Sequence, residues 1–163
     1  MSQTTVMSFA RALNSVFEES GVSGLQVGEI IPRESNTAPS RTFQVSVSVG
    51  LAGAIRGYMF LQSDTATASA LARELANGLG VPLEEPEEFG QMHRAALAEL
   101  ANQISGRATM YLSEAGVDAR ITPPSVLTGS SITLAVADGL HFYDTSVSGP
   151  AGTFALVVGL QEP

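Results

Sequence analysis

A stripe of apolar residues at helical spacing runs through the middle of the chain and constrains the fold more than any other feature. Its members recur at i, i+3, i+4 and i+7, the period of an α-helix with one buried face. They are Leu97, Leu100, Ala101, Ile104, Ala108 and Tyr111. We expect this helix to span residues 87–115. The acidic run at 84–88 contains a proline and is typical of a helix start, where proline fits and carboxylates are favoured.

The rest of the chain predicts two further helices and a set of strands. The helices are expected at 5–20 and from Ser63 or Asp64 to about 79. The strands are expected at 24–32, 42–51, 54–61, 117–122, 125–127, 131–137, 141–147 and 153–161. A hairpin is expected at Ala52-Gly53, and a polar loop at 33–41. These elements predict an α+β fold, a single domain over residues 1–163 with a mostly antiparallel sheet packed against long helices.

The side of the central helix that faces away from the stripe carries Glu99 and Asn102, three positions apart. Ala95 and Gly106 fall on the same side and leave a strip almost without side chains. A glycine inside a helix costs about 1 kcal/mol relative to alanine, so Gly106 requires a reason, and close approach by another backbone would supply one. The alternative is that Glu99 is a solvated helix carboxylate and Gly106 a tolerated weakness.

Composition excludes several classes of protein. With 44% hydrophobic and 15% charged residues, the chain is not expected to be disordered. Its net charge of -8 would repel a phosphate backbone, so nucleic acid is not an expected partner. The absence of cysteine excludes disulfides and thiolate metal sites. No apolar run approaches about 18 residues and no signal peptide is recognisable, so we expect a cytoplasmic protein without membrane contact.

Other residues that could carry chemistry form no convincing constellation. His93 and His141 are far apart in the sequence, and neither has a clear carboxylate and nucleophile partner for a triad. The acidic run at 84–88 fits a helix start better than a metal site. Met110 lies close to the Glu99 side by helical phase, so it is expected either to line a partner groove or to cap a sheet edge.

Three landmarks in order resemble the CheX branch of the CheC/CheX/FliY chemotaxis phosphatases. The first is Glu99-Leu-Ala-Asn102-Gln-Ile-Ser-Gly106-Arg-Ala108, which contains the Glu-x-x-Asn hallmark of the family. The others are Leu112-Ser-Glu-Ala-Gly116 and Ile121-Thr-Pro-Pro-Ser-Val-Leu-Thr-Gly129. A looser match extends over most of the chain. One departure is Ala95, because family members often carry Asp or Ser four residues before the glutamate.

The resemblance implies a phosphatase that acts on the phospho-aspartate of a CheY-like response regulator. A carboxamide can donate and accept hydrogen bonds without repelling phosphoryl oxygens, so Asn102 would orient the attacking water. Glu99 would pair with the receiver's active-site lysine, and Ala95, Gln103 and Gly106 would contact the partner. The chain itself would bind no cofactor, because Mg²⁺ would belong to the receiver domain. The family also implies a homodimer.

Three alternatives remain beside this interpretation. The chain can be a CheX-like interaction module that binds a response regulator or another signalling protein without hydrolysis. A small-ligand binding domain is a third class, but no polar cluster supports it. Within the phosphatase interpretation, Glu74-Leu-Ala-Asn77 repeats the motif letters, and CheC-type relatives carry two active sites. Because Asn77 precedes Gly78 at an expected helix end, we predict one site.

Overall fold

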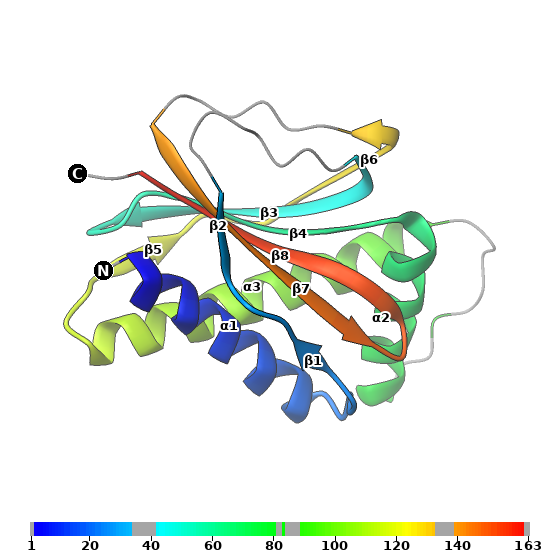
Figure 1. Cartoon of the computed structure of the whole chain (residues 1–163). Coiled ribbons are helices and arrows are strands. Elements are labelled where there is room, and N and C mark those ends of the chain that lie inside the picture. Colours follow the sequence, from blue (N-terminus) through cyan, green and yellow to red (C-terminus); the bar gives the residue numbers. More distant parts are fainter. Residues whose placement is uncertain (1, 34–41, 81–82, 84–88, 133–138, 162–163) are drawn as a thin grey trace.

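The computed structural model describes residues 2–33, 42–80, 83, 89–132 and 139–161, and in this part of the chain the helices lie on one face of an antiparallel sheet (Figure 1). The helices are α1 (Ser2–Glu19), α2 (Thr65–Gly78) and α3 (Gln91–Glu114). The strands are β1 (Gln26–Val27), β2 (Ile31–Arg33), β3 (Phe43–Gly53), β4 (Gly57–Ser63), β5 (Ala119–Ile121), β6 (Ser125–Ile132), β7 (Leu140–Gly149) and β8 (Gly152–Gln161). The predicted α+β class, with its antiparallel sheet and long helices, is confirmed.

The sheet has the strand order β1-β7-β8-β4-β3-β5, with β2 also paired to β7 and β6 also paired to β3. Strands β7 and β8 form a long hairpin from Leu140↔Gln161 to Gly149↔Gly152. Helices α2 and α3 are inserted in the sequence between β4 and β5. Helix α3 is therefore followed directly by β5, which pairs with the end of β3.

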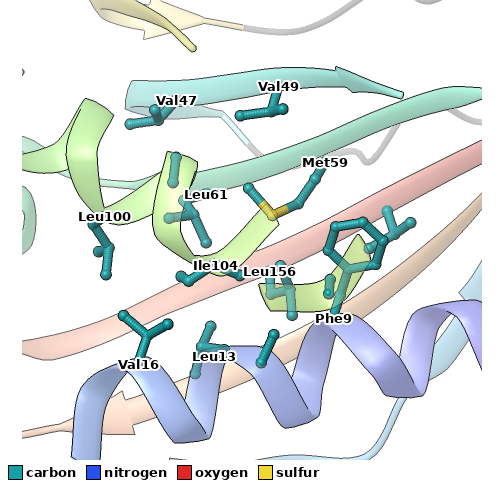
Figure 2. Close-up of a cluster of buried hydrophobic side chains, with 14 of the residues drawn as sticks. Phe9, Leu13, Val16, Val47, Val49, Met59, Leu61, Leu100, Ile104 and Leu156 are labelled. Atoms are coloured by element: carbon teal, nitrogen blue, oxygen red, sulfur yellow. The ribbon is translucent and has the colours of Figure 1, made fainter. Parts of the chain in front are cut away.

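The main core lies between the helices and the sheet (Figure 2). The labelled side chains come from α1, α3, β3, β4 and β8: Phe9, Leu13, Val16, Leu100, Ile104, Val47, Val49, Met59, Leu61 and Leu156. Burial of one such side chain stabilises the fold by roughly 1.5–3 kcal/mol. The buried side of α3 is therefore held firmly, and the orientation of its opposite side is fixed as well.

A second, smaller cluster is buried on the other face of the sheet. It consists of Phe60, Leu140, Phe142, Ala155 and Val157. Because β8 contributes to both clusters, seven consecutive residues from Phe154 to Leu160 are buried. A strand buried on both faces has a continuous apolar sequence rather than an alternating one.

The ends of the helices differ in part from the sequence prediction. Asp64 caps α2, as expected, because its Oδ1 accepts a hydrogen bond from the Thr67 backbone N–H at 2.7 Å. Helix α3 begins at Gln91 after the N-cap Gly90, so the predicted start at residue 87 was wrong. The acidic run at 84–88 and most of the 33–41 loop lie outside the described residues. None of the described helices has the length and apolar character needed to cross a membrane.

Several strand boundaries also require correction. The segment predicted as one strand at 24–32 forms two short strands, β1 and β2. The first hairpin turns after Gly53 rather than at Ala52-Gly53, because Gly53 has φ 101° and still pairs with Ala119 of β5. The strands expected separately at 125–127 and 131–137 overlap with the single strand β6. Residues 133–137 lie outside the described part of the chain.

Candidate functional site

Helix α3 presents Glu99 and Asn102 to solvent on the side opposite its buried stripe. Leu97, Leu100 and Ile104 are buried, and the two polar side chains are exposed. Residues three apart on a helix have Cβ atoms about 5–6 Å apart. A carboxylate and a carboxamide are thus offered together on one exposed side of the helix, and the orientation predicted from helical spacing is confirmed.

Small residues lie on both sides of this pair. Ala95 is exposed, and a Cβ added to Gly106 would meet nothing within 4 Å beyond its own helix neighbourhood. Gly106 is half-buried, but a side chain at this position would meet no other described segment, so close packing inside this protein does not explain the glycine. Met110, one turn further along the helix, is also exposed. The strip around Asn102 is therefore open to another molecule.

Gln103 makes direct contact with the glutamate of the pair. Its Nε2 donates a hydrogen bond to Glu99 Oε1 at 3.1 Å, across one turn of α3. This bond leaves the second carboxylate oxygen of Glu99 available, since none of the described arginines forms an ion pair with it. Glu99 is thus an exposed negative charge held by a neutral neighbour.

An ion pair next to Gly106 fastens α3 to α1. Arg107 donates two hydrogen bonds to Glu19, with Nη1–Oε1 and Nη2–Oε2 distances of 2.8 Å each. These hydrogen bonds lower the pKa of the Glu19 carboxyl and raise the pKa of Arg107. Sequence reasoning did not find the pair, because its partners are 88 positions apart and no local pattern connects them.

A second contact between the same helices involves Tyr111. Its hydroxyl lies 2.9 Å from Ser15 Oγ, and the Arg11 guanidinium lies 3.8 Å from the centre of its ring. The hydrogen bond with Ser15 is the main cause of the lowered pKa of Tyr111. Tyr111 is only half-buried, so it lies at the edge of the predicted apolar stripe and not in its centre.

The two histidines do not contribute to this site. His93 is buried, and its Nδ1 accepts a hydrogen bond from the Gly90 backbone N–H at 3.1 Å, which caps the start of α3. His141 is half-buried on β7. In the described part of the chain, no three His, Asp or Glu side chains gather in a way that could hold a metal ion.

The second Glu-Leu-Ala-Asn sequence lies at the end of α2 in a different environment. Asn77 is exposed, but a Cβ on the following Gly78 would collide with the backbone carbonyl oxygen of Ser20. The end of α1 therefore packs closely against the helix at this point. The surroundings of Glu74 and Asn77 are partly covered, whereas the strip on α3 is open, and a single site stays our prediction.

Comparisons with known proteins point to one family. Residues 45–147 match the family described as chemotaxis phosphatase CheX. The fold is similar to that of a CheC-like superfamily protein from Shewanella sp. PV-4, with TM-score 0.79 and 22% identity over 99% of this chain and 100% of that chain. A chemotaxis protein CheX from Desulfovibrio desulfuricans gives TM-score 0.80 and 23% identity over 96% and 99% of the two chains. No curated protein matches.

A further similar structure is that of a complex. The CheX-CheY-BeF₃-Mg²⁺ complex from Borrelia burgdorferi gives TM-score 0.76 and 26% identity, covering 96% of this chain and 97% of the matched one. The family match covers more than half of the sequence and includes the whole of α3 with Glu99 and Asn102. The chain therefore belongs to the CheX family of chemotaxis phosphatases.

Proposed function

We propose that this protein removes the phosphoryl group from the phospho-aspartate of a CheY-like response regulator. The observation that carries this proposal is the exposed pair of Glu99 and Asn102 on α3, within an open strip formed with Ala95 and Gly106. A projecting helix face of this kind is suited to enter the active site of a partner. Membership of the CheX family supports the same reaction.

Asn102 is the residue proposed to act on the attacking water. An acyl phosphate is already reactive, so catalysis consists mainly of placing water in line with the bond that breaks. The water oxygen bonds to phosphorus, the bond between phosphorus and the aspartate oxygen breaks, and the aspartate leaves as a carboxylate. The protons of the water remain with inorganic phosphate and solvent. The neutral carboxamide of Asn102 can orient the water without repelling the phosphoryl oxygens.

Glu99 is proposed to bind the partner rather than to transfer protons. Its exposed carboxylate would pair with the receiver's active-site lysine and draw that lysine away from the phosphoryl group. Exposed ion pairs contribute only about 0–1 kcal/mol, but a pair that becomes desolvated in an interface contributes more. The hydrogen bond from Gln103 supports this role because it restricts the carboxylate.

The remaining parts of the proposal concern the assembly. Mg²⁺ would be bound by the receiver domain and not by this chain. A homodimer in the cytoplasm is also proposed, with the outer strands β2 and β6 as candidate contact edges. Sedimentation of the purified protein at several concentrations would test the dimer directly.

The test of the function is the decay of phosphorylated receiver domains from the same organism, with and without this protein. Asn102→Ala should abolish the acceleration while binding is retained, and Glu99→Ala should weaken binding. Asn77→Ala is the matched control, because it removes the same side chain from the second Glu-Leu-Ala-Asn sequence and should change neither quantity. Retained acceleration in the Asn102→Ala variant would contradict the proposed mechanism.

A second candidate function is a binding module without hydrolysis. The exposed Ala95 favours it, because the family often has a polar side chain at this position, one turn before Glu99. Such a module would bind a receiver without shortening the lifetime of its phosphoryl group. Binding that is equally strong to phosphorylated and unphosphorylated receivers would select this candidate.

A further inference from the structure

An apolar groove of about 270 Å³ lies beside Glu99, between the end of α2 and the first half of α3. We call it the Leu79 groove. Its apolar lining includes Leu75, Leu79, Leu83, Met92, Ala96 and Leu100. Leu79 and Met92 have 69% and 55% of their surface exposed. These two side chains remain in water in the isolated chain, and covering them would be favourable.

The size of the Leu79 groove indicates what kind of group it can hold. Small-molecule sites usually have volumes of about 300–1,000 Å³ and enclose most of the ligand. At about 270 Å³ this groove is at the lower limit of that range, and it lies open between two helices instead of enclosing a ligand. It is therefore suited to one or two apolar side chains that project from the surface of another protein.

The charge at the rim restricts the occupant further. Glu99 and Gln103 also line the groove, and the described neighbour that binds the Glu99 carboxylate is the neutral Gln103. The sequence contains no lysine, and its basic residues are all arginine. An occupant that presents a cation next to an apolar side chain would pair with Glu99 at the rim and cover the apolar lining at the same time.

We propose that the Leu79 groove binds an apolar side chain that the receiver domain presents beside the lysine that pairs with Glu99. This inference rests on the proposed function and assigns to the groove a part in the choice of receiver. A second copy of this chain is a poorer occupant, because the proposed homodimer uses the outer strands β2 and β6, and neither strand lines the groove.

The experiment measures binding and dephosphorylation with the same variants. The probes are the organism's CheY-like receiver domains, either loaded with BeF₃⁻ and Mg²⁺ for binding or phosphorylated for decay. Met92→Gln and Leu79→Gln place polar groups in the groove at exposed positions, so the fold is retained. Met92→Leu keeps the apolar surface. Met7→Gln is the control, since Met7 is 60% exposed on α1 and does not line the groove.

Both glutamine variants should weaken receiver binding about five- to thirtyfold, the range expected for an apolar anchor in an interface. The receiver concentration for half-maximal rate should rise by the same factor, while the rate at saturation is retained. Met92→Leu and Met7→Gln should bind like the wild type. This split between binding and rate differs from the effect of Asn102→Ala, which should lower the rate alone.

The outcomes separate the groove from the proposed function. Unchanged receiver binding by Met92→Gln and Leu79→Gln, together with loss of acceleration in Asn102→Ala, would overturn the proposed role of the groove. The proposed phosphatase function would be retained. Weakened binding in a protein that does not accelerate decay would support the groove and reject the phosphatase. A change in self-association without a change in receiver binding would identify a second copy as the occupant and overturn the inference.

Discussion

Arg107 and Glu19 form a two-bonded ion pair that ties the end of α1 to α3 directly beside Gly106. The side chains are 28% and 61% exposed, so dissolved salt screens their attraction. The pair joins α1 to the helix that carries Asn102, five residues earlier.

The pKa of Glu19 predicts how this contact depends on pH. Its pKa in the folded chain lies below the ordinary value of 4.5, so the unfolded chain takes up the proton more readily. The stabilisation is fully present above pH 4.5 and is lost as the pH falls through the lowered pKa. Glu19→Gln should therefore lower the urea midpoint near neutral pH and have no effect in acid. Glu18→Gln, at an exposed position next to it, is the control, and equal effects of both variants would contradict the prediction.

Gly106 and Gly78 should respond in opposite ways to the same substitution. Gly106→Ala adds a methyl group in open space and should raise the free energy of unfolding by about 0.5–1 kcal/mol. The same methyl group should hinder the approach of a receiver and reduce the acceleration of dephosphorylation. Denaturant unfolding and phosphoryl decay, measured on one preparation, check both effects. A more stable variant with full activity would show that the open strip is not a contact surface.

Gly78→Ala is the matched substitution at the second Glu-Leu-Ala-Asn sequence. Its new Cβ would meet the carbonyl oxygen of Ser20, so the ends of α1 and α2 would have to separate. We expect a lower free energy of unfolding and, where the protein remains folded, an unchanged rate of dephosphorylation at saturating receiver. Thermal unfolding of the Gly78→Ala and Gly106→Ala variants should thus move in opposite directions from the wild type.

Asp64 should contribute to stability as the cap of α2. Its carboxylate accepts the Thr67 N–H at 2.7 Å, and loss of such a cap costs about 0.5–2 kcal/mol. Asp64→Ala should lower the free energy of unfolding by this amount, which appears as a lower denaturation midpoint with an unchanged denaturant slope. Asp64→Asn keeps an oxygen acceptor and should recover most of the loss. Equal stability of the Ala and Asn variants would argue against the cap.

Ile104 should be among the most costly positions to truncate. It is fully buried at the centre of the buried stripe of α3. Removal of a buried isoleucine side chain to alanine costs about 2–5 kcal/mol, because a cavity adds to the lost burial. Met110→Ala on the exposed side of the same helix provides the comparison and should cost far less. Urea unfolding of both variants measures the contrast.

Helical phase explains why the orientation of the candidate site could be predicted from the sequence. The period of 3.6 residues places Leu97 and Ile104 on one side and Glu99 and Asn102 on the other, and tertiary structure did not change this. The helix start was missed because Gly90, and not the acidic run, provides the N-cap. The Gly90 backbone N–H donates a hydrogen bond to His93 Nδ1 in the first turn of α3. That contact requires His93 to be buried, and the position of His93 in the sequence does not reveal its burial.

Contacts between distant segments could not be predicted. The Arg107–Glu19 pair and the Leu79 groove depend on how α1, α2 and α3 pack together. The strands predicted at 125–127 and 131–137 left Gly129 between them, yet β6 runs through Gly129 with an irregular register against β3 between Phe43 and Val45. A glycine is compatible with either a turn or an irregular strand, and the neighbouring strand decides between them.

The two sides of α3 meet separate physical requirements. Positions such as Leu100 and Ile104 answer to the stability of the fold, whereas Glu99, Asn102 and Gly106 touch nothing that the core requires. Substitutions at such exposed positions usually change stability by no more than about 0.5 kcal/mol. Substitutions on the exposed side can thus change what the helix contacts while the domain stays folded.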